Sequence, residues 1–137
     1  MGVFRGDRPN TSAVKAALKL KWAVNNIVSP KLTAQYPNSK YKMRYTVGID
    51  CSEVLVVRGG VRDSNDLAWI GNAANIAAKL NTLPSEYPTW ITHRVYEKMA
   101  DEAKFGGNPR RHMWEKRPWT AMGDMTIYRS NWQWSFK

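Results

Sequence analysis

The chain has 137 residues and a formal net charge of +10, from 21 lysines and arginines against 11 aspartates and glutamates. The length fits one domain, and a hydrophobic content of 43% is that of a folded chain, which excludes a disordered protein. A single cysteine excludes an internal disulfide and a cysteine-based metal cluster. The positive charge concerns partners and not the fold, because it attracts nucleotides, nucleic acid or an acidic surface.

Hydropathy bears on where the protein is found. The sequence has no apolar segment long enough to cross a bilayer, and residues 1–10 lack the apolar run of a secretory leader. Together with the lone cysteine, this predicts a cytoplasmic protein without a membrane partner.

The N-terminal part of the chain predicts a short strand followed by a long helix. Residues 1–4 are apolar and strand-like, and a loop with glycine and proline follows them. From Ala13 to Val28 apolar residues recur at helical spacing. Pro30 is expected to end this helix, because a proline cannot donate the next backbone hydrogen bond. Residues 31–40 then form a polar connector.

The middle of the chain predicts a β-hairpin. Apolar and polar residues alternate over 43–49, and 54–57 form a continuous apolar run, so both segments predict strands. The turn between them, 50–53, is short enough to pair the two strands directly. Asp50 and Glu53 flank that turn, where carboxylates are typical of turn chemistry.

The rest of the chain predicts strands and helices in alternation. They are a brief strand over 67–70, a helix after Gly71, a strand over 89–92, a helix over 93–105, and strands over 113–119 and 125–130. Such an alternation, with a hairpin among the strands, predicts an α+β fold, which we expect to be one domain over 1–137.

The helix after Gly71 carries the candidate functional residues. Asn75 and Lys79 stand four residues apart, so they share one helical face and place an amide beside a cation. Burying such a pair without partners costs several kcal/mol, so its place on an otherwise apolar, alanine-rich helix needs a cause. The cause is either structural, with Asn75 bonded to a neighbouring strand and Lys79 simply exposed, or a ligand.

The run RYTVGIDCSEVL…NDLAWIGNAANIAAKL resembles the class III nucleotide cyclases. The matching residues are Gly48, Ile49 and Val54 in the strand and turn, and Gly71, Asn75 and Ala77 in the helix. Two alanines before Asn75 and Ala-Ala-Lys after it are similar to the bacterial Pycsar antiphage uridylate cyclases. The N-terminal VFRGDRPNTSAVKAALK also resembles the segment that follows the second metal-binding strand of that group.

This resemblance implies a fold and a reaction. The fold is a ferredoxin-like sandwich, with helices on one face of a mainly antiparallel sheet, working as a homodimer with its sites at the interface. In the reaction the ribose 3′-hydroxyl attacks the α-phosphate and pyrophosphate leaves. Asn75 would orient the ribose and Lys79 would stabilise the transition state. A lysine there supplies the charge without the bidentate fork of the family's usual arginine.

The resemblance also bears on the base. Lys42 aligns with the base-contacting lysine of adenylate cyclases, whereas Ala68 stands where those enzymes carry a carboxylate that accepts from the adenine amino group. Without that acceptor, adenine loses a specific hydrogen bond. The preferred substrate is therefore UTP, converted to cyclic UMP, with ATP as the alternative because Asp66 lies two residues away and can replace the acceptor.

The family's reaction uses two divalent cations, Mn²⁺ or Mg²⁺. The two aspartates that bind them would both precede Met1, so we expect this chain to be the C-terminal part of a cyclase domain. We expect it to hold no metal ligand of its own and to have little activity alone.

Two other functions stay open. One is a degenerate cyclase kept as a regulatory dimer partner. The other is a basic ferredoxin-like module that binds RNA or nucleotides without catalysis, which the charge permits. The predicted strands do not carry the paired aromatic residues of RNA-recognition sheets, so nucleic acid is not the preferred partner.

Overall fold

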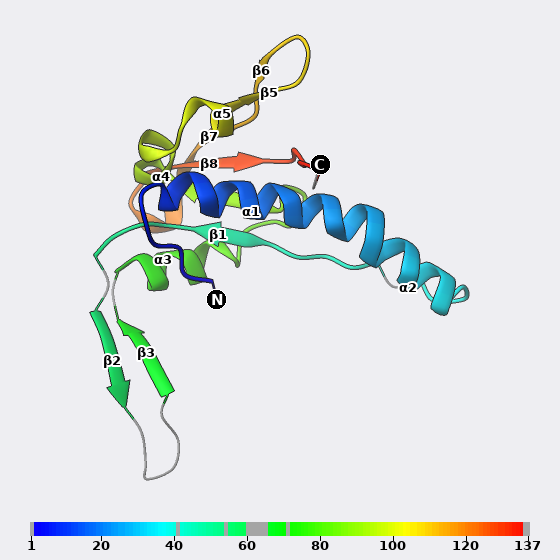
Figure 1. Ribbon diagram of the computed structural model, residues 1–137, viewed down its shortest axis with the longest axis horizontal. Helices are drawn as coiled ribbons and strands as arrows, with labels where there is room; N and C mark the ends of the chain where they lie inside the picture. The colour runs from blue at the N-terminus through cyan, green and yellow to red at the C-terminus, as the bar shows by residue number, and fades with distance from the viewer. Residues whose placement is uncertain (1, 41, 54, 60–65, 71, 136–137) are drawn as a thin grey trace.

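A four-stranded mixed sheet forms the centre of the protein (Figure 1). The computed structural model describes residues 2–40, 42–53, 55–59, 66–70 and 72–135. The strand order is β1-β4-β8-β7. β1 (Val47–Ile49) runs parallel to β4 (Thr89–Thr92), and β8 (Met125–Ser130) is antiparallel to β4 and to β7 (Glu115–Trp119). The expected α+β class with a mainly antiparallel sheet is therefore confirmed.

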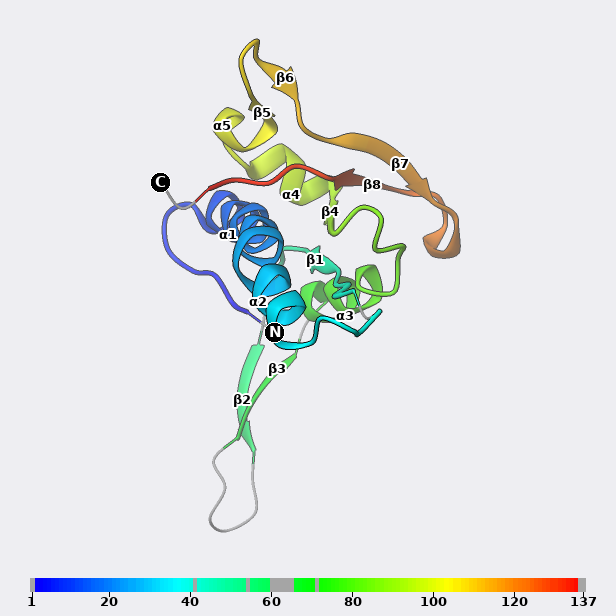
Figure 2. The same ribbon diagram turned by 90° about the vertical axis from the view of Figure 1, so that its right-hand side faces the viewer.

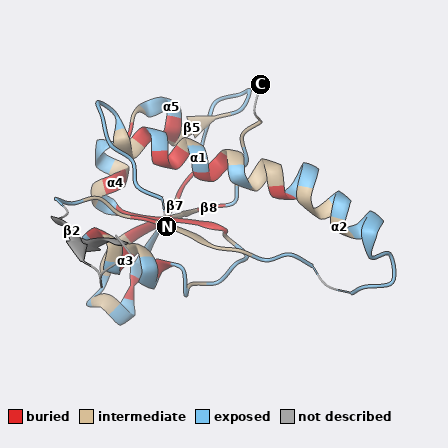
Figure 3. Ribbon diagram, turned by 60° about the horizontal axis from the view of Figure 1, so that its bottom comes forward, coloured by how far each residue is buried: buried red, intermediate tan, exposed pale blue. Residues whose placement is uncertain are grey.

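Helices cover both faces of this sheet (Figure 3). α1 (Pro9–Ala23) and α4 (His93–Lys98) pack on one face, and α3 (Asn72–Leu80) packs on the other. The alternation of side chains along β4 serves both layers, because Ile91 belongs to the core under α1 and Trp90 to the core under α3. The expectation of helices on one face is corrected on this point.

The N-terminal helix continues past Pro30 instead of ending there. α1 is followed directly by the π-helical η1 (Val24–Val28) and by α2 (Ser29–Gln35), whose seven residues are all outside the core. In η1 the N–H of Ser29 donates to the carbonyl of Val24, so the wider turn shifts the bonding pattern just before the proline. Pro30 then lies in the first turn of α2, directly after this wider turn.

The predicted hairpin across 50–53 is wrong. β2 (Leu55–Gly59) does not pair with β1 but forms an antiparallel pair with β3 (Asp66–Ile70). This pair projects away from the central sheet (Figures 1 and 2). β1 pairs in parallel with β4, and a parallel pair needs a crossover connection, here through α3.

Three other expected elements differ from the structure. Residues 2–4 and 42–46 have no regular secondary structure, so the predicted first strand is absent there and β1 begins only at Val47. The helix expected over 93–105 is split into α4 and α5 (Asp101–Lys104). The split falls where the N–H of Ala100 donates to Thr11 Oγ1 at 2.9 Å, outside the helical pattern.

The C-terminal half otherwise follows the prediction. β3, β4, β7 and β8 lie within one or two residues of their expected bounds. Two short strands, β5 (Phe105–Gly106) and β6 (Arg111–His112), pair with each other, and the 3₁₀ turn η2 (Thr120–Met122) joins β7 to β8. In the described part of the chain, no helix has both the length and the apolar character to span a bilayer.

Candidate functional site

α3 is an amphipathic helix whose two faces have different surroundings. Ala73, Ile76 and Leu80 are buried, and Ile76 and Leu80 pack with Trp90 of β4. Asn75 and Lys79 are both exposed on the other face. Their four-residue spacing does place them on one side of the helix, as predicted. In this chain neither side chain is covered by the sheet.

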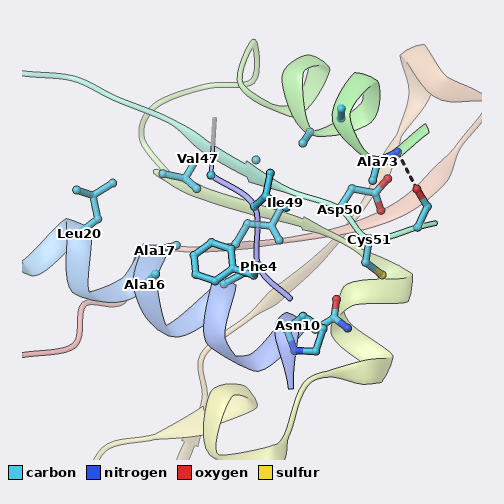
Figure 4. A pocket seen from close by; sticks show the side chains of 18 residues that line it. Phe4, Asn10, Ala16, Ala17, Leu20, Val47, Ile49, Asp50, Cys51 and Ala73 are labelled. Atoms are coloured by element: carbon cyan, nitrogen blue, oxygen red, sulfur yellow. Dashed lines mark hydrogen bonds between the residues drawn. The ribbon is translucent and has the colours of Figure 1, made fainter. Parts of the chain in front are cut away.

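Two contacts fix α3 against the end of β1. Ser52 Oγ accepts a hydrogen bond from the N–H of Ala73 at 3.1 Å (Figure 4). The first N–H groups of a helix have no partner within it, so a hydroxyl satisfies one of them here. A β-carbon at Gly48 would lie 2.4 Å from the Ala77 carbonyl oxygen, so only glycine allows this approach of strand and helix.

A cavity of about 540 Å³ lies between α1, β1 and α3 (Figure 4). Its walls are mainly apolar and small, with Ala13, Ala16, Ala17 and Leu20 from α1, Val47 and Ile49 from β1, and Ala73, Ala74 and Ala77 from α3. Phe4 lies across it, and Asn10, Asp50 and Ser52 supply its polar groups. Asn75 and Lys79 are not among the described lining residues, so the cavity and the predicted catalytic pair occupy different sides of α3.

Asp50 is the charged group of this region. Its side chain has no exposed surface, and Oδ1 accepts hydrogen bonds from Thr92 Oγ1 at 2.6 Å and from Arg94 Nε at 2.6 Å. Arg94 Nη2 also donates to Oδ2. The hydrogen bond to the Asp50 carboxylate raises the pKa of the Arg94 guanidinium, so Arg94 stays charged. Asp50 is therefore half of an ion pair, not a turn residue as the sequence indicated.

Cys51 follows Asp50 at the rim of the same cavity. Burial raises the pKa of its thiol, which keeps it protonated near neutral pH. A raised pKa disfavours the thiolate that a nucleophilic cysteine needs.

Comparison with known proteins identifies relatives over nearly the whole chain. It is 48% identical over 134 residues to a uridylate cyclase of Xanthomonas perforans, and 43% identical over 135 residues to a uridylate cyclase of Burkholderia cepacia. A uridylate cyclase of Rhodovulum sp. (strain MB263) is 39% identical over 136 residues. The chain is related to the uridylate cyclases. The resemblance predicted from residues 1–80 is thus confirmed and extends past Asn81, where the sequence motifs are thin.

The alignments cover 96% or more of this chain but only 57% of each of these uridylate cyclases. The chain therefore spans a little over half the length of the relatives it matches. No family model matches it.

The three residues predicted to read the base belong to segments other than α3. Lys42 is exposed in the segment that leads into β1. Asp66 and Ala68 are on β3, where their backbones lie opposite Gly59 and Val57, and their side chains are outside the described part of the structure. Their roles in a uridylate cyclase remain predictions.

The described residues do not fit a divalent cation site. Among them, no three His, Cys, Asp or Glu side chains gather in a way that could hold a metal ion. The buried carboxylate of Asp50 is already occupied by Arg94 and Thr92. We therefore derive no catalytic step from a metal held by these residues.

Sequence reasoning missed Arg94 and Thr92. Neither residue belongs to a motif, and their link to Asp50 exists because the carboxyl ends of β1 and β4 are neighbours. A sequence signal was present, since Asp50 and Thr92 each stand at the end of an apolar strand segment. The wrong prediction of a β-hairpin after β1 placed Asp50 in a turn, so its position beside β4 was not considered.

Proposed function

We propose that the polypeptide containing this chain is a uridylate cyclase, which converts UTP to cyclic UMP and pyrophosphate. The observation that carries the proposal is 39–48% identity, over at least 96% of the chain, to three proteins named uridylate cyclase. By its resemblance to the Pycsar group we also propose a role in bacterial antiphage signalling, in the cytoplasm.

The proposed chemistry assigns Asn75 and Lys79 to the reacting nucleotide. The Asn75 amide can donate to and accept from the ribose, which aligns the 3′-hydroxyl with the α-phosphate. The Lys79 ammonium lies one helical turn later and would stabilise the negative charge that develops on the phosphoryl oxygens. Exposure of both side chains supports this assignment, because a nucleotide can reach them without unfolding the helix.

We propose that a second copy of the polypeptide completes the site. Asn75 and Lys79 lie outside the cavity and face away from the sheet of their own chain. An exposed amide and cation on one helix cannot by themselves enclose a triphosphate and exclude water. A homodimer with the nucleotide between two copies supplies the missing wall.

Two side chains favour UTP as the proposed substrate. Ala68 cannot accept a hydrogen bond from the adenine amino group, and Lys42 can donate to a uracil carbonyl. ATP is the alternative if Asp66 supplies that acceptor.

The proposed reaction requires Mn²⁺ or Mg²⁺. The described residues do not form the ligand set, so the cations would be held by other parts of the polypeptide. Chelation with EDTA is expected to stop cyclic UMP formation, and excess Mn²⁺ to restore it.

The test is an assay of the complete polypeptide with UTP and Mn²⁺, with cyclic UMP detected by mass spectrometry and ATP tested in parallel. Asn75→Ala is expected to lower turnover by about 100-fold, because one positioning and stabilising group is lost. Asn72→Ala, an exposed asparagine of the same helix, is the matched control and should keep full activity.

Unchanged turnover in Asn75→Ala would show that the site is assigned to the wrong residues. Absence of any cyclic nucleotide, together with RNA binding that weakens steeply with salt, would favour the basic binding module instead.

A further inference from the structure

An ion pair between the buried carboxylate of Asp50 and the partly exposed guanidinium of Arg94 joins the end of β1 to the start of α4. The Asp50 side chain is fully enclosed and its two oxygens are held by the fork of Arg94, with Thr92 as a third donor. A bidentate pair fixes orientation as well as charge. The direction in which the chain leaves β1 is therefore set from α4.

The segment around Asp50, which is bonded to Arg94, also contacts α3. Ser52, two residues after Asp50, accepts the N–H of Ala73 in the first turn of the helix. Gly48, two residues before Asp50, lies directly under the Ala77 carbonyl. The segment 48–52 thus contacts α3 at both of its ends, and the Asp50–Arg94 ion pair fixes its middle.

We propose that Arg94 is a positioning residue for the α3 site. It orients Asp50, and the segment that follows carries Ser52, whose hydroxyl accepts the N–H of Ala73 at the start of α3. The helix in turn presents Asn75 and Lys79 at fixed places. Arg94 is not among the described residues that line the cavity, and it acts through Asp50 and not on the nucleotide. The inference rests on the proposed function, because α3 carries the proposed catalytic pair.

Hydrogen exchange on the 137-residue chain tests the link without any catalytic assay. Arg94→Met keeps an unbranched side chain but removes the donors, so the amides of 72–80 should exchange faster while those of β8 stay protected. Ser52→Ala leaves the ion pair intact and should speed exchange of the same α3 amides. Unchanged α3 exchange in Ser52→Ala, or in folded Arg94→Met, overturns the proposal.

Turnover of UTP by the complete polypeptide is the second measurement. Arg94→Met is expected to lower kcat on the order of 10- to 100-fold with KM changed by less than about twofold, because misplaced groups act on the chemical step. Arg94→Lys restores the charge and should recover part of the loss. The control is Arg117→Met, which removes an exposed arginine paired with Glu115 at 3.1 Å and should leave kcat unchanged. A rise in KM with kcat intact in Arg94→Met overturns the proposal.

The double variant separates positioning from general destabilisation. If both residues act along one path, Arg94→Met with Ser52→Ala loses no more kcat than the more damaging single variant. Losses that multiply would place the residues on independent paths and overturn the proposal. If the unsubstituted polypeptide makes no cyclic UMP, the proposed function fails, while the exchange experiment still decides the link to α3.

Discussion

Gly48 marks the closest contact between the central sheet and the helix that carries the proposed site. A β-carbon there would lie 2.4 Å from the Ala77 carbonyl oxygen and 2.6 Å from Leu80 Cβ, so Gly48→Ala must push α3 off β1. We expect the free energy of unfolding to fall by about 1–3 kcal/mol, measured by urea denaturation. Gly2→Ala is the control, since among the described residues its β-carbon would meet only Phe4 Cε2, at an ordinary contact distance of 3.6 Å. Equal stability of both variants would contradict the close approach.

Tyr45 carries a buried hydroxyl that has no hydrogen-bond partner among the described residues, and burial raises its pKa from 10.0 to about 12. A folded-state pKa above the unfolded one means that its stabilisation is complete below pH 10.0 and is lost as the pH rises through about 12. Tyr45→Phe removes this ionisation and the unsatisfied oxygen. The variant should match or exceed wild type at neutral pH and lose less stability in alkali.

Denaturant unfolding at neutral pH and between pH 10 and 12 measures the effect of Tyr45→Phe. Tyr36→Phe provides the comparison, because Tyr36 is 55% exposed and its phenol reaches solvent in both states. The same alkaline loss in Tyr45→Phe as in wild type would mean that the Tyr45 hydroxyl is not shielded in the folded chain.

At the scale of elements, α3 places stability and proposed function on different faces. Leu80 is fully buried with Ile76, Trp90, Trp119 and Ile127, so Leu80→Ala should lower the free energy of unfolding by about 2–5 kcal/mol. Lys79→Ala, one residue earlier and exposed, should change it by less than about 0.5 kcal/mol while abolishing turnover. Urea denaturation and the UTP assay on both variants give the comparison. A large loss of stability in Lys79→Ala would contradict this division.

Elements that depend on local pattern were predictable from the sequence. β4 is four buried residues between a proline and a polar helix start, and β8 and α3 follow their own periodicities. The wrong predictions concern pairings between residues that are far apart in the sequence. The partner of β1 is β4, some forty residues later, and no local signal distinguishes that pairing from a hairpin with β2. Pro30 does not end the helix, which continues into α2 through a π turn just before the proline.

The same distinction applies to the candidate site. The shared, exposed helical face of Asn75 and Lys79 was predictable, because a four-residue helical spacing is visible directly in the sequence, while their roles stay a prediction. Arg94 was not identified, since its partner Asp50 comes 44 positions earlier and meets it only through the parallel pairing of two strands. Ser52 is a similar case, with a link to α3 across 21 positions.

At the scale of the whole molecule, the chain leaves large surfaces open. β2 and β3 project on one side, and α2 projects on another, each away from the central sheet (Figure 1). Leu20 and Ile27 on the N-terminal helix are 44% and 41% exposed, and Asn75 and Lys79 are exposed on α3. These exposed apolar side chains and the exposed face of α3 are surfaces that the proposed second copy could cover.

A site shared between two copies predicts that the specific activity of the complete polypeptide depends on protein concentration. In the proposed homodimer only the dimer would enclose the nucleotide, so cyclic UMP formed per polypeptide per second should be constant at high concentration and fall on dilution below the dimer dissociation constant. Sedimentation at the same concentrations should show dimer giving way to monomer over the same range. Lys79→Ala should dissociate with wild-type affinity, because a single exposed cation contributes little to a large interface. Specific activity that stays constant through the monomer range would place both halves of the site in one chain and exclude a shared arrangement.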